Sequence, residues 1–328
     1  MACVRRILLR NERVASIAKR NGLLARTCRS VIRRRASLVR NTLDGDRSGS
    51  EKETIVVAFG GNALLSRGQE LTFENQRKNA AVAAQEVAKL MKRYKTCITH
   101  GNGPQVGLLA LLMGPEARLD VLDAETEGSI GYVLELQISN AIGCSKNMVS
   151  MLTQVTVDRD DPAFHNPTKP IGKQYREEEL ARLDPSWRFA KDGAKYYRRV
   201  VPSPLPSGIV EGPSIQLLME NNVTVICCGG GGIPVVERMN EDGRLERQGI
   251  EAVVDKDATS SVLGAEIGAS KLLMLTDAEC VYDPLAWPDE LRPLPTPISV
   301  QSLKEMEFAP GSMMPKIEAA IHFVEVCI

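Results

Sequence analysis

Short apolar runs alternate with longer amphipathic stretches along this chain. The apolar runs are rich in β-branched residues, which favours buried strands. The amphipathic stretches carry apolar residues at helical spacing, as in residues 73–94, where Val82, Val87 and Met91 are expected on one side. Strands that alternate with helices predict βαβ units and an α/β fold with a mainly parallel sheet.

The alternation begins at Thr54 and is interrupted twice. The predicted strands are Thr54–Phe59, Thr96–Thr99, Val149–Val157, Val223–Cys228 and Lys271–Thr276. The predicted helices are Phe73–Tyr94, Val106–Met113, Asp120–Ile142, Gly212–Asn221, Lys256–Gly268, Ser299–Phe308 and Lys316–Val326. Asp158–Pro206 is rich in proline and too long for an idle loop, so it predicts a small lid or excursion on the main sheet. Pro284–Pro297 predicts a proline-rich loop.

Three of the predicted strands run directly into glycine clusters. These clusters are Gly60-Gly61-Asn62, Gly101-Asn102-Gly103 and Gly229–Gly232. Glycine allows sharp turns at positive φ and close approach of a ligand to the backbone. After a parallel strand, such a loop directs free N–H groups at an anion. Three such loops predict a crevice for several phosphate-like charges, which fits phosphoryl transfer better than the binding of one phosphate.

The chain carries equal numbers of basic and acidic residues, but they are unevenly distributed. Residues 1–50 hold 13 of the 41 Lys and Arg residues and only three of the 41 acids. The remainder, residues 51–328, is therefore acidic, which argues against nucleic acid as the main partner. No apolar run approaches the roughly 18 residues of a membrane span.

The basic N-terminal segment has the composition of a targeting sequence. It is rich in Arg, contains Ser and has few acids, which is typical of a mitochondrial transit peptide. We expect a mitochondrion or a related organelle; the alternative is a cytoplasmic protein with a disordered basic tail. Residues 44–50 have the composition of a linker, so the folded domain is expected at 51–328.

Common nucleotide-binding and metal-binding motifs are absent from the sequence. There is no P-loop motif. Gly107 comes one residue too late after Gly101 and Gly103 to complete a dinucleotide fingerprint, which disfavours an oxidoreductase of the Rossmann type. The eight cysteines include no C-x-x-C pair and predict neither a zinc site nor a disulfide framework, so a reducing compartment is implied.

Three lysines lie in rigid or charged surroundings. Lys169 is flanked by prolines, Lys256 lies between Asp255 and Asp257, and Lys316 opens a predicted helix after a proline. A single lysine is usually a solvated surface residue, but phosphoryl transfer needs positive charge that is held in place. Asp257 and its neighbour are candidates for orienting Lys256 or for holding Mg²⁺ through water. Favourable interaction of acids with a helix N-terminus explains them equally well.

Several segments, which occur in the family's order, together resemble the carbamate kinases of the amino acid kinase family. They include VVAFGGNALL (56–65), THGNGPQVG (99–107), NPTKPIG (166–172), CGGGGIPVV (228–236), EAVVDKD (251–257) and FAPGSMMPKIEAAIHFVE (308–325). The resemblance implies a three-layer αβα sandwich around a mainly parallel, roughly eight-stranded sheet. A small protruding subdomain at about 159–206 and a homodimer are also implied.

The resemblance also implies an activity: reversible phosphoryl transfer between ATP and carbamate, with Mg²⁺ bound through the nucleotide and no metal ligand predicted in the protein. ADP and carbamoyl phosphate are the products. In fermenting members of the family the reverse direction makes ATP during arginine breakdown.

Site residues follow from the matching motifs. Lys169, Lys256, Asp257 and Lys316 would be catalytic. The substrate and phosphoryl group would be bound by Gly60, Gly61, Asn62, Gly101, Asn102, Gly103, Gly230, Gly231 and Gly232. The nucleotide would lie near Thr276, Asp277, Tyr282 and Met313.

Two alternatives remain open at this point. The family pattern continues past the helix that ends near Val326 into a further strand and helix, so the expectation is that this chain lacks them. An impaired or non-catalytic binding subunit is therefore one alternative. The other is a related kinase acting on a different carboxylate or phosphate, against which the NPTKPIG segment weighs.

Overall fold

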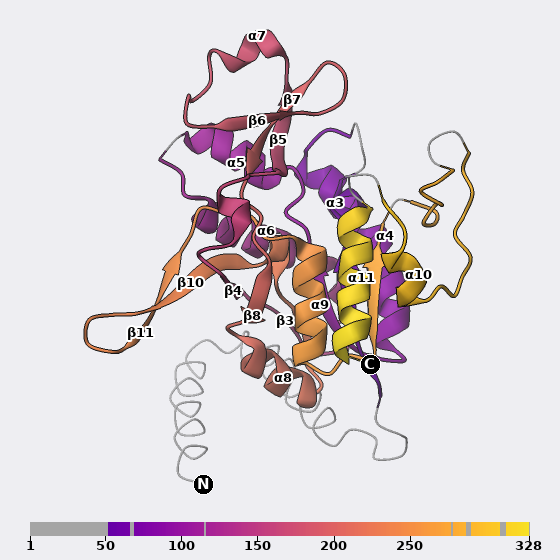
Figure 1. Ribbon diagram of the computed structural model, residues 1–328. Helices are drawn as coiled ribbons and strands as arrows, with labels where there is room; N and C mark the ends of the chain where they lie inside the picture. Colours follow the sequence, from indigo (N-terminus) through magenta and orange to yellow (C-terminus); the bar gives the residue numbers. More distant parts are fainter. Residues whose placement is uncertain are drawn as a thin grey trace, which may run out of the picture. The chain divides into compact units, whose positions relative to one another are not determined.

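The computed structural model describes residues 52–65, 69–114, 116–276, 278–286, 290–308 and 313–327. All of these residues belong to one compact unit, Lys52–Ile328 (Figure 1). The expected leader, residues 1–50, lies outside the described residues. None of the helices in the described ranges combines the length and apolarity needed to cross a membrane.

The main body contains nine strands and eight α-helices within the described ranges. The strands are β1 (Thr54–Phe59), β2 (Lys95–His100), β3 (Met148–Ser150), β4 (Gln154–Val157), β8 (Pro206–Ile209), β9 (Thr224–Ile226), β10 (Ile233–Met239), β11 (Leu245–Gly249) and β12 (Lys271–Leu275). The helices are α3 (Gly61–Leu64), α4 (Phe73–Met91), α5 (Gln105–Met113), α6 (Leu119–Ala141), α8 (Gly212–Glu220), α9 (Lys256–Glu266), α10 (Val300–Lys304) and α11 (Met314–Cys327).

The central sheet has five strands in the order β12-β1-β2-β9-β3, and all of its pairings are parallel. Val56 of β1 lies between Leu272 on one neighbour and Cys97 on the other. The strand is almost wholly buried, as expected for a parallel strand covered on both faces. The α/β fold with a mainly parallel central sheet, predicted from the alternation, is confirmed.

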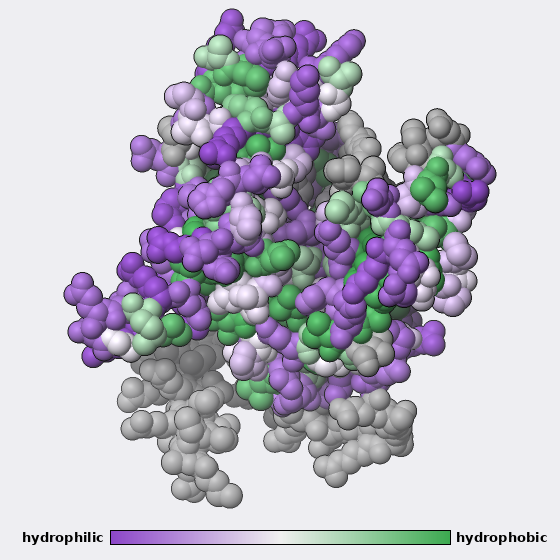
Figure 2. Space-filling model, viewed as in Figure 1, coloured by the Kyte–Doolittle hydropathy of each residue, from purple (hydrophilic) through white to green (hydrophobic). Residues whose placement is uncertain are grey.

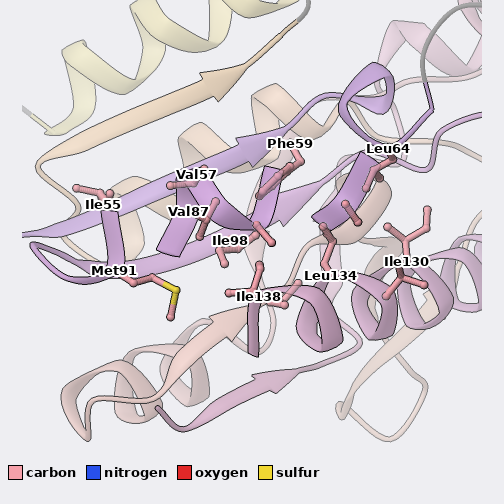
Figure 3. Packing of buried hydrophobic residues seen from close by; sticks show 14 residues of the cluster. Ile55, Val57, Phe59, Leu64, Val87, Met91, Ile98, Ile130, Leu134 and Ile138 are labelled. Atoms are coloured by element: carbon pink, nitrogen blue, oxygen red, sulfur yellow. The ribbon is translucent and has the colours of Figure 1, made fainter. Parts of the chain in front are cut away.

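Helices cover both faces of this sheet, which makes the three layers. Ile55, Val57 and Phe59 point into a core shared with α4 and α6 (Figure 3). Val56 points to the opposite face, where α8, α9 and α11 pack. Val82 was expected on the buried side of its helix, but it is exposed. The buried side of α4 is formed by Ala80, Ala84, Val87, Ala88 and Met91. Small alanines allow α4 to lie close to the sheet.

A second, four-stranded sheet continues the body in the order β11-β10-β4-β8. The run Val149–Val157, predicted as one strand, is divided between β3 of the central sheet and β4 of this second sheet. The backbone amide of Thr153 donates to Glu127 on α6 instead of to a neighbouring strand. That bond interrupts the hydrogen-bond ladder between the strands. The β-branched residues of this run could not indicate the interruption. The antiparallel pair β10–β11 was not predicted.

The excursion 158–206 folds into a small sheet with short helical turns, which we call the subdomain. It contains the 3-10 turn η1 (Pro162–Phe164), β5 (Lys169–Tyr175), α7 (Glu177–Leu180), β6 (Arg188–Lys191) and β7 (Tyr197–Val201). The strands form an antiparallel sheet in the order β5-β7-β6, and hydrophilic side chains predominate at its outer end around α7 (Figure 2). Tyr175 and Phe189 pack edge to face with ring centroids 5.8 Å apart.

The subdomain joins the body through a close backbone approach. A Cβ atom added to Gly107 of α5 would lie 2.0 Å from the Cα atom of Gly172 on β5. Only glycine allows this contact, so Gly107 determines how closely β5 rests on α5.

We expect Gly107→Ala to lower the free energy of unfolding by about 1–3 kcal/mol, because the added methyl group would overpack against backbone atoms that cannot rotate away. Urea unfolding followed by circular dichroism measures this loss. Gly128→Ala is the matched control, since its Cβ would meet only a Leu152 methyl at 3.7 Å. Equal stability of the two variants would contradict the proposed contact.

Candidate active site

The glycine clusters meet at the carboxyl edge of the central sheet. The Gly60 amide, after β1, donates to the carbonyl oxygen of Leu275 at 3.1 Å. The Gly101 amide, after β2, donates to the carbonyl oxygen of Phe59 at 3.0 Å. Because the strands are parallel and adjacent, their exits lie side by side, as the sequence predicted.

The first two loops touch each other and one of the lysines. A Cβ atom on Gly61 would lie 3.4 Å from the Cα atom of Gly103. A Cβ atom on Gly101 would lie 3.1 Å from Cδ of Lys256. The aliphatic part of this lysine therefore rests on the loop after β2. Asn62 lies in α3, but its side chain is outside the described part of the structure.

The third loop is a turn of successive glycines with positive φ, 72° at Gly230, 104° at Gly231 and 82° at Gly232. A Cβ atom on Gly230 would lie 1.9 Å from Oδ1 of Asn102. The carbonyl oxygen of Gly231 accepts a hydrogen bond from Thr259 Oγ1 of α9 at 2.9 Å. The turn therefore lies between the loop after β2 and the first turns of α9.

Two of the predicted lysines share one carboxylate oxygen. Nζ of Lys256 and Nζ of Lys316 each lie 2.8 Å from Oδ2 of Asp257. The Asp257 side chain is only 4% exposed, and the two lysine side chains are 13% and 12% exposed. The other carboxylate oxygen, Oδ1, is buried without a hydrogen-bond partner among the described residues. Burial lowers the pKa of Lys256, and the positive charge of Lys316 lowers it further. The Asp257 carboxylate acts in the opposite direction and raises this pKa.

The third predicted lysine reaches the same place from the subdomain. Lys169, at the start of β5, donates a hydrogen bond to Oδ2 of Asp255. Asp255 is the N-cap of α9, and its Oδ1 accepts from the Asp257 amide at 2.9 Å. Burial would raise the pKa of Asp255, but the charges of Lys169 and Lys256 outweigh it and lower the pKa below its usual range.

These five side chains form what we call the lysine cluster: Lys169, Lys256, Lys316, Asp255 and Asp257. Three ammonium groups face two carboxylates, which leaves an excess of one positive charge in a largely buried place. An anion that enters the cluster recovers Coulomb energy at low local dielectric. The cluster and the glycine loops together can therefore bind a phosphoryl group.

Helix α6 holds the loops in position, and the sequence analysis missed this role. Asn102 Nδ2 donates to Asp123 Oδ1 at 2.7 Å, and Thr126 Oγ1 donates to Asn102 Oδ1 at 3.0 Å. Glu127 accepts from the Gly229 amide at 2.8 Å and from the Thr153 amide at 3.1 Å. The available signal was a pair of acids, four residues apart, on the largely apolar buried face of this helix.

Both α6 acids are almost completely buried. Burial raises the pKa of Asp123 well above its usual value, although the bond from Asn102 opposes the shift. Burial also raises the pKa of Glu127 to about 8, against the two backbone amides that stabilise its charge. His100, packed near Gly229, is neutral at pH 7 because burial lowers its pKa to about 4.

The structure gives fewer contacts for the residues predicted near the nucleotide. Thr276 follows β12 directly, at the same edge of the sheet as Gly60. The carbonyl oxygen of Met313 accepts a hydrogen bond from the Lys316 amide at 3.0 Å. Met313 therefore lies one helical turn before a lysine of the cluster. Tyr282 pairs with Pro293 in the loop between β12 and α10. Asp277 lies outside the described residues, and nucleotide binding by these four remains a prediction.

Within the described ranges, no group of three or more His, Cys, Asp or Glu side chains could hold a metal ion.

Comparisons with known proteins identify relatives of the chain. The profile of the amino acid kinase family matches residues 53–328. The carbamate kinase of Haemophilus influenzae is 44% identical over 278 residues, which cover 83% of this chain and 87% of that protein. The carbamate kinase of Rhizobium meliloti is 44% identical over 277 residues, which cover 82% and 84% of the two chains. Carbamate kinase from Giardia lamblia bound to AMP-PNP has a TM-score of 0.72 and 37% identity, covering 85% of this chain and 92% of that one.

We expect Glu127 to make the stability of the protein depend on pH. The pKa of this carboxyl is about 8 in the folded protein, compared with 4.5 without burial. The folded state therefore retains a proton that the unfolded state loses between these values, and stability falls as pH rises through this window. Glu127→Gln removes this dependence. The difference in unfolding free energy, wild type minus variant, should fall by about 1 kcal/mol per pH unit between pH 5 and 8.

Urea unfolding at several pH values measures this difference. Glu125→Gln is the control, because Glu125 is exposed on the same helix and should leave the pH dependence unchanged. A wild-type pH dependence in Glu127→Gln would show that this carboxyl is not the titrating group.

Proposed function

This chain belongs to the amino acid kinase family, and we propose that, like its carbamate kinase relatives, it catalyses reversible phosphoryl transfer between ATP and carbamate. The observation that carries the proposal is the lysine cluster, with its excess positive charge, directly beside the glycine loops. The similarity to carbamate kinases over more than four fifths of the chain selects carbamate as the acceptor.

The reaction brings two anions together. A carbamate oxygen forms a bond to the γ-phosphorus of ATP, and the bond from that phosphorus to the β,γ-bridging oxygen breaks, which releases ADP and carbamoyl phosphate. Carbamate is already ionised and needs no general base. The main tasks of the protein are alignment of the two anions and neutralisation of their charge.

The residues divide these tasks. The ammonium groups of Lys256 and Lys316 offset the negative charge on the transferring group, and Asp257 holds both of them in position. The glycine turn at 229–232 offers backbone amides that carry no side-chain bulk. Lys169 adds charge from the subdomain.

Magnesium fits this arrangement as a partner of the nucleotide. When bound, Mg²⁺ would supply further neutralisation of the phosphate charge. Oδ1 of Asp257, which has no hydrogen-bond partner in the described part of the chain, is a suitable acceptor for a water molecule of the hydrated ion. We therefore propose Mg²⁺ with ATP or ADP as the cofactor.

We also propose that the protein is a homodimer that associates through the exposed apolar part of α6. Tyr132 and Leu136, four residues apart on this helix, are 59% and 38% exposed. They line a cavity of about 410 Å³ together with Leu152. Exposed apolar groups around a hollow are typical of a surface that a second copy covers.

For residues 1–50 we propose targeting to a mitochondrion or a related organelle, supported by their Arg-rich and acid-poor composition. A fluorescent protein fused to this segment tests the proposal. Diffuse cytoplasmic fluorescence would refute it.

We expect Lys256→Ala to lower turnover at least about tenfold, because one buried positive charge at the transferring group contributes roughly 2–4 kcal/mol to transition-state stabilisation. A coupled assay of ATP formation from ADP and carbamoyl phosphate measures the rate. Lys304→Ala is the control, since Lys304 forms a surface pair with Glu325 and its loss should leave the rate unchanged. Wild-type turnover by a folded Lys256→Ala protein would refute the assignment, and an inactive wild type would refute the proposed reaction.

We expect Leu136→Asp to convert the dimer into a monomer, because a buried unpaired carboxylate at an interface costs several kcal/mol. Light scattering after size exclusion should show the wild type at twice the chain mass of 35.9 kDa. Leu217→Asp, exposed on α8, should remain a dimer. A monomeric wild type would contradict the proposed interface.

A further inference from the structure

A second charged cavity lies at the root of the subdomain. Its volume is about 380 Å³. Trp187, Arg188 and Arg199 line it from the subdomain, and Leu119 and Glu251 line it from the body. No lysine of the cluster is among the residues that line this cavity. The residues that line this cavity are therefore different from those of the lysine cluster.

Arg199 is the unusual residue of this cavity. It lies on β7, the middle strand of the subdomain sheet, opposite Ile171 on one side and Phe189 on the other. Its guanidinium carbon lies 4.1 Å from the centroid of the Trp187 ring. The side chain is half-buried, and within the described part of the chain it forms no hydrogen bond or ion pair. Burial lowers the pKa of this guanidinium, so its surroundings disfavour the charge.

The neighbouring Arg198 behaves differently. Its guanidinium pairs with the carboxylate of Asp192 at 2.8 Å. Two consecutive arginines on one strand point to opposite faces. On the face of Arg199, no carboxylate of the described residues forms an ion pair with it, although Glu251 and Asp184 act on it electrostatically. Contact with an indole ring compensates part of the lost hydration, but it leaves the N–H groups at the edge of the guanidinium without acceptors.

The remaining walls indicate which anion would fit. A guanidinium presents its N–H groups in one plane, and this fork matches the two oxygens of a carboxylate. Glu251 lies on the body side of the cavity and interacts with Arg199 electrostatically without forming an ion pair. Its negative charge opposes a dianion such as phosphate more than a monoanion. Leu119, Ala117 and Val200 supply apolar surface.

We propose that this cavity binds a small monocarboxylate, with Arg199 as the carboxylate-binding group and the wall around Leu119 in contact with the hydrocarbon part of the ligand. Such a ligand would contact the subdomain and the body at once. It would therefore favour one position of the subdomain, which also carries Lys169.

Trp187 fluorescence reports on this cavity directly. The chain has two tryptophans, so Trp287→Phe gives a parent protein in which Trp187 is the only emitter. Titration of the full-length parent with n-butyrate should give a saturable change in emission. Arg199→Gln should weaken binding at least about tenfold, the effect of losing a charge-assisted hydrogen bond. Arg198→Gln, the matched control, should bind as the parent does.

A second titration, with inorganic phosphate as the ligand, keeps the test valid if Arg199→Gln does not fold. Phosphate should bind the parent more weakly than butyrate does, and Glu251→Gln should reduce that difference by removing the repulsion. A gain in phosphate binding supports the proposal. Three results would each overturn it. In the first, the parent shows no saturable response to butyrate. In the second, a folded Arg199→Gln protein binds butyrate as tightly as the parent does. In the third, Glu251→Gln leaves the ratio of butyrate affinity to phosphate affinity unchanged. Because the readout does not involve phosphoryl transfer, the proposed enzymatic activity and this site can fail independently.

Discussion

Two carboxylates at the start of α9, Asp257 buried and Asp255 largely so, hold the functional part of this molecule together. Asp255 and Asp257 accept three ammonium groups that come from β5, α9 and α11. An unpaired charge in this largely buried position would cost several kcal/mol, so the pairs require these elements to meet. Lys169 is 86 residues from Asp255 in sequence, and Lys316 is 59 residues from Asp257. The folding of distant segments and the assembly of the site are therefore one event.

The parallel sheet provides the other half of the arrangement. It places the loops after β1, β2 and β9 at one edge, and α6 then fixes two of them through Asn102 and the Gly229 amide. Asp123 and Glu127 of α6 accept these hydrogen bonds. Their effect is to keep backbone amides oriented before a substrate arrives, so that less reorganisation is needed during the reaction. The subdomain meets the body at Gly107 and at Lys169, and the second contact brings the charge of Lys169 into the lysine cluster.

The strands of the central sheet were predictable because burial on both faces leaves a continuous apolar run. β1 begins and ends at the predicted residues, and β12 differs by one residue. The division of Val149–Val157 into β3 and β4 was not predictable, because it depends on the Thr153 amide donating to Glu127 on a distant helix. The exposure of Val82 was unpredictable for the same reason. Small alanines set how α4 packs on the sheet, and this packing decides which side of the helix is buried.

The sequence alone determined where the chain turns on glycine after a strand and which lysines have proline or aspartate beside them. It also determined the resemblance to the carbamate kinases. These features depend on neighbouring residues, whose conformational preferences act within a few positions. Only the tertiary structure decided that Lys256 and Lys316 share one oxygen of Asp257, that two acids of α6 support the glycine loops, and that Arg199 lies over the Trp187 ring. Burial and charge pairing depend on which distant segments come into contact, and a linear pattern does not specify those contacts.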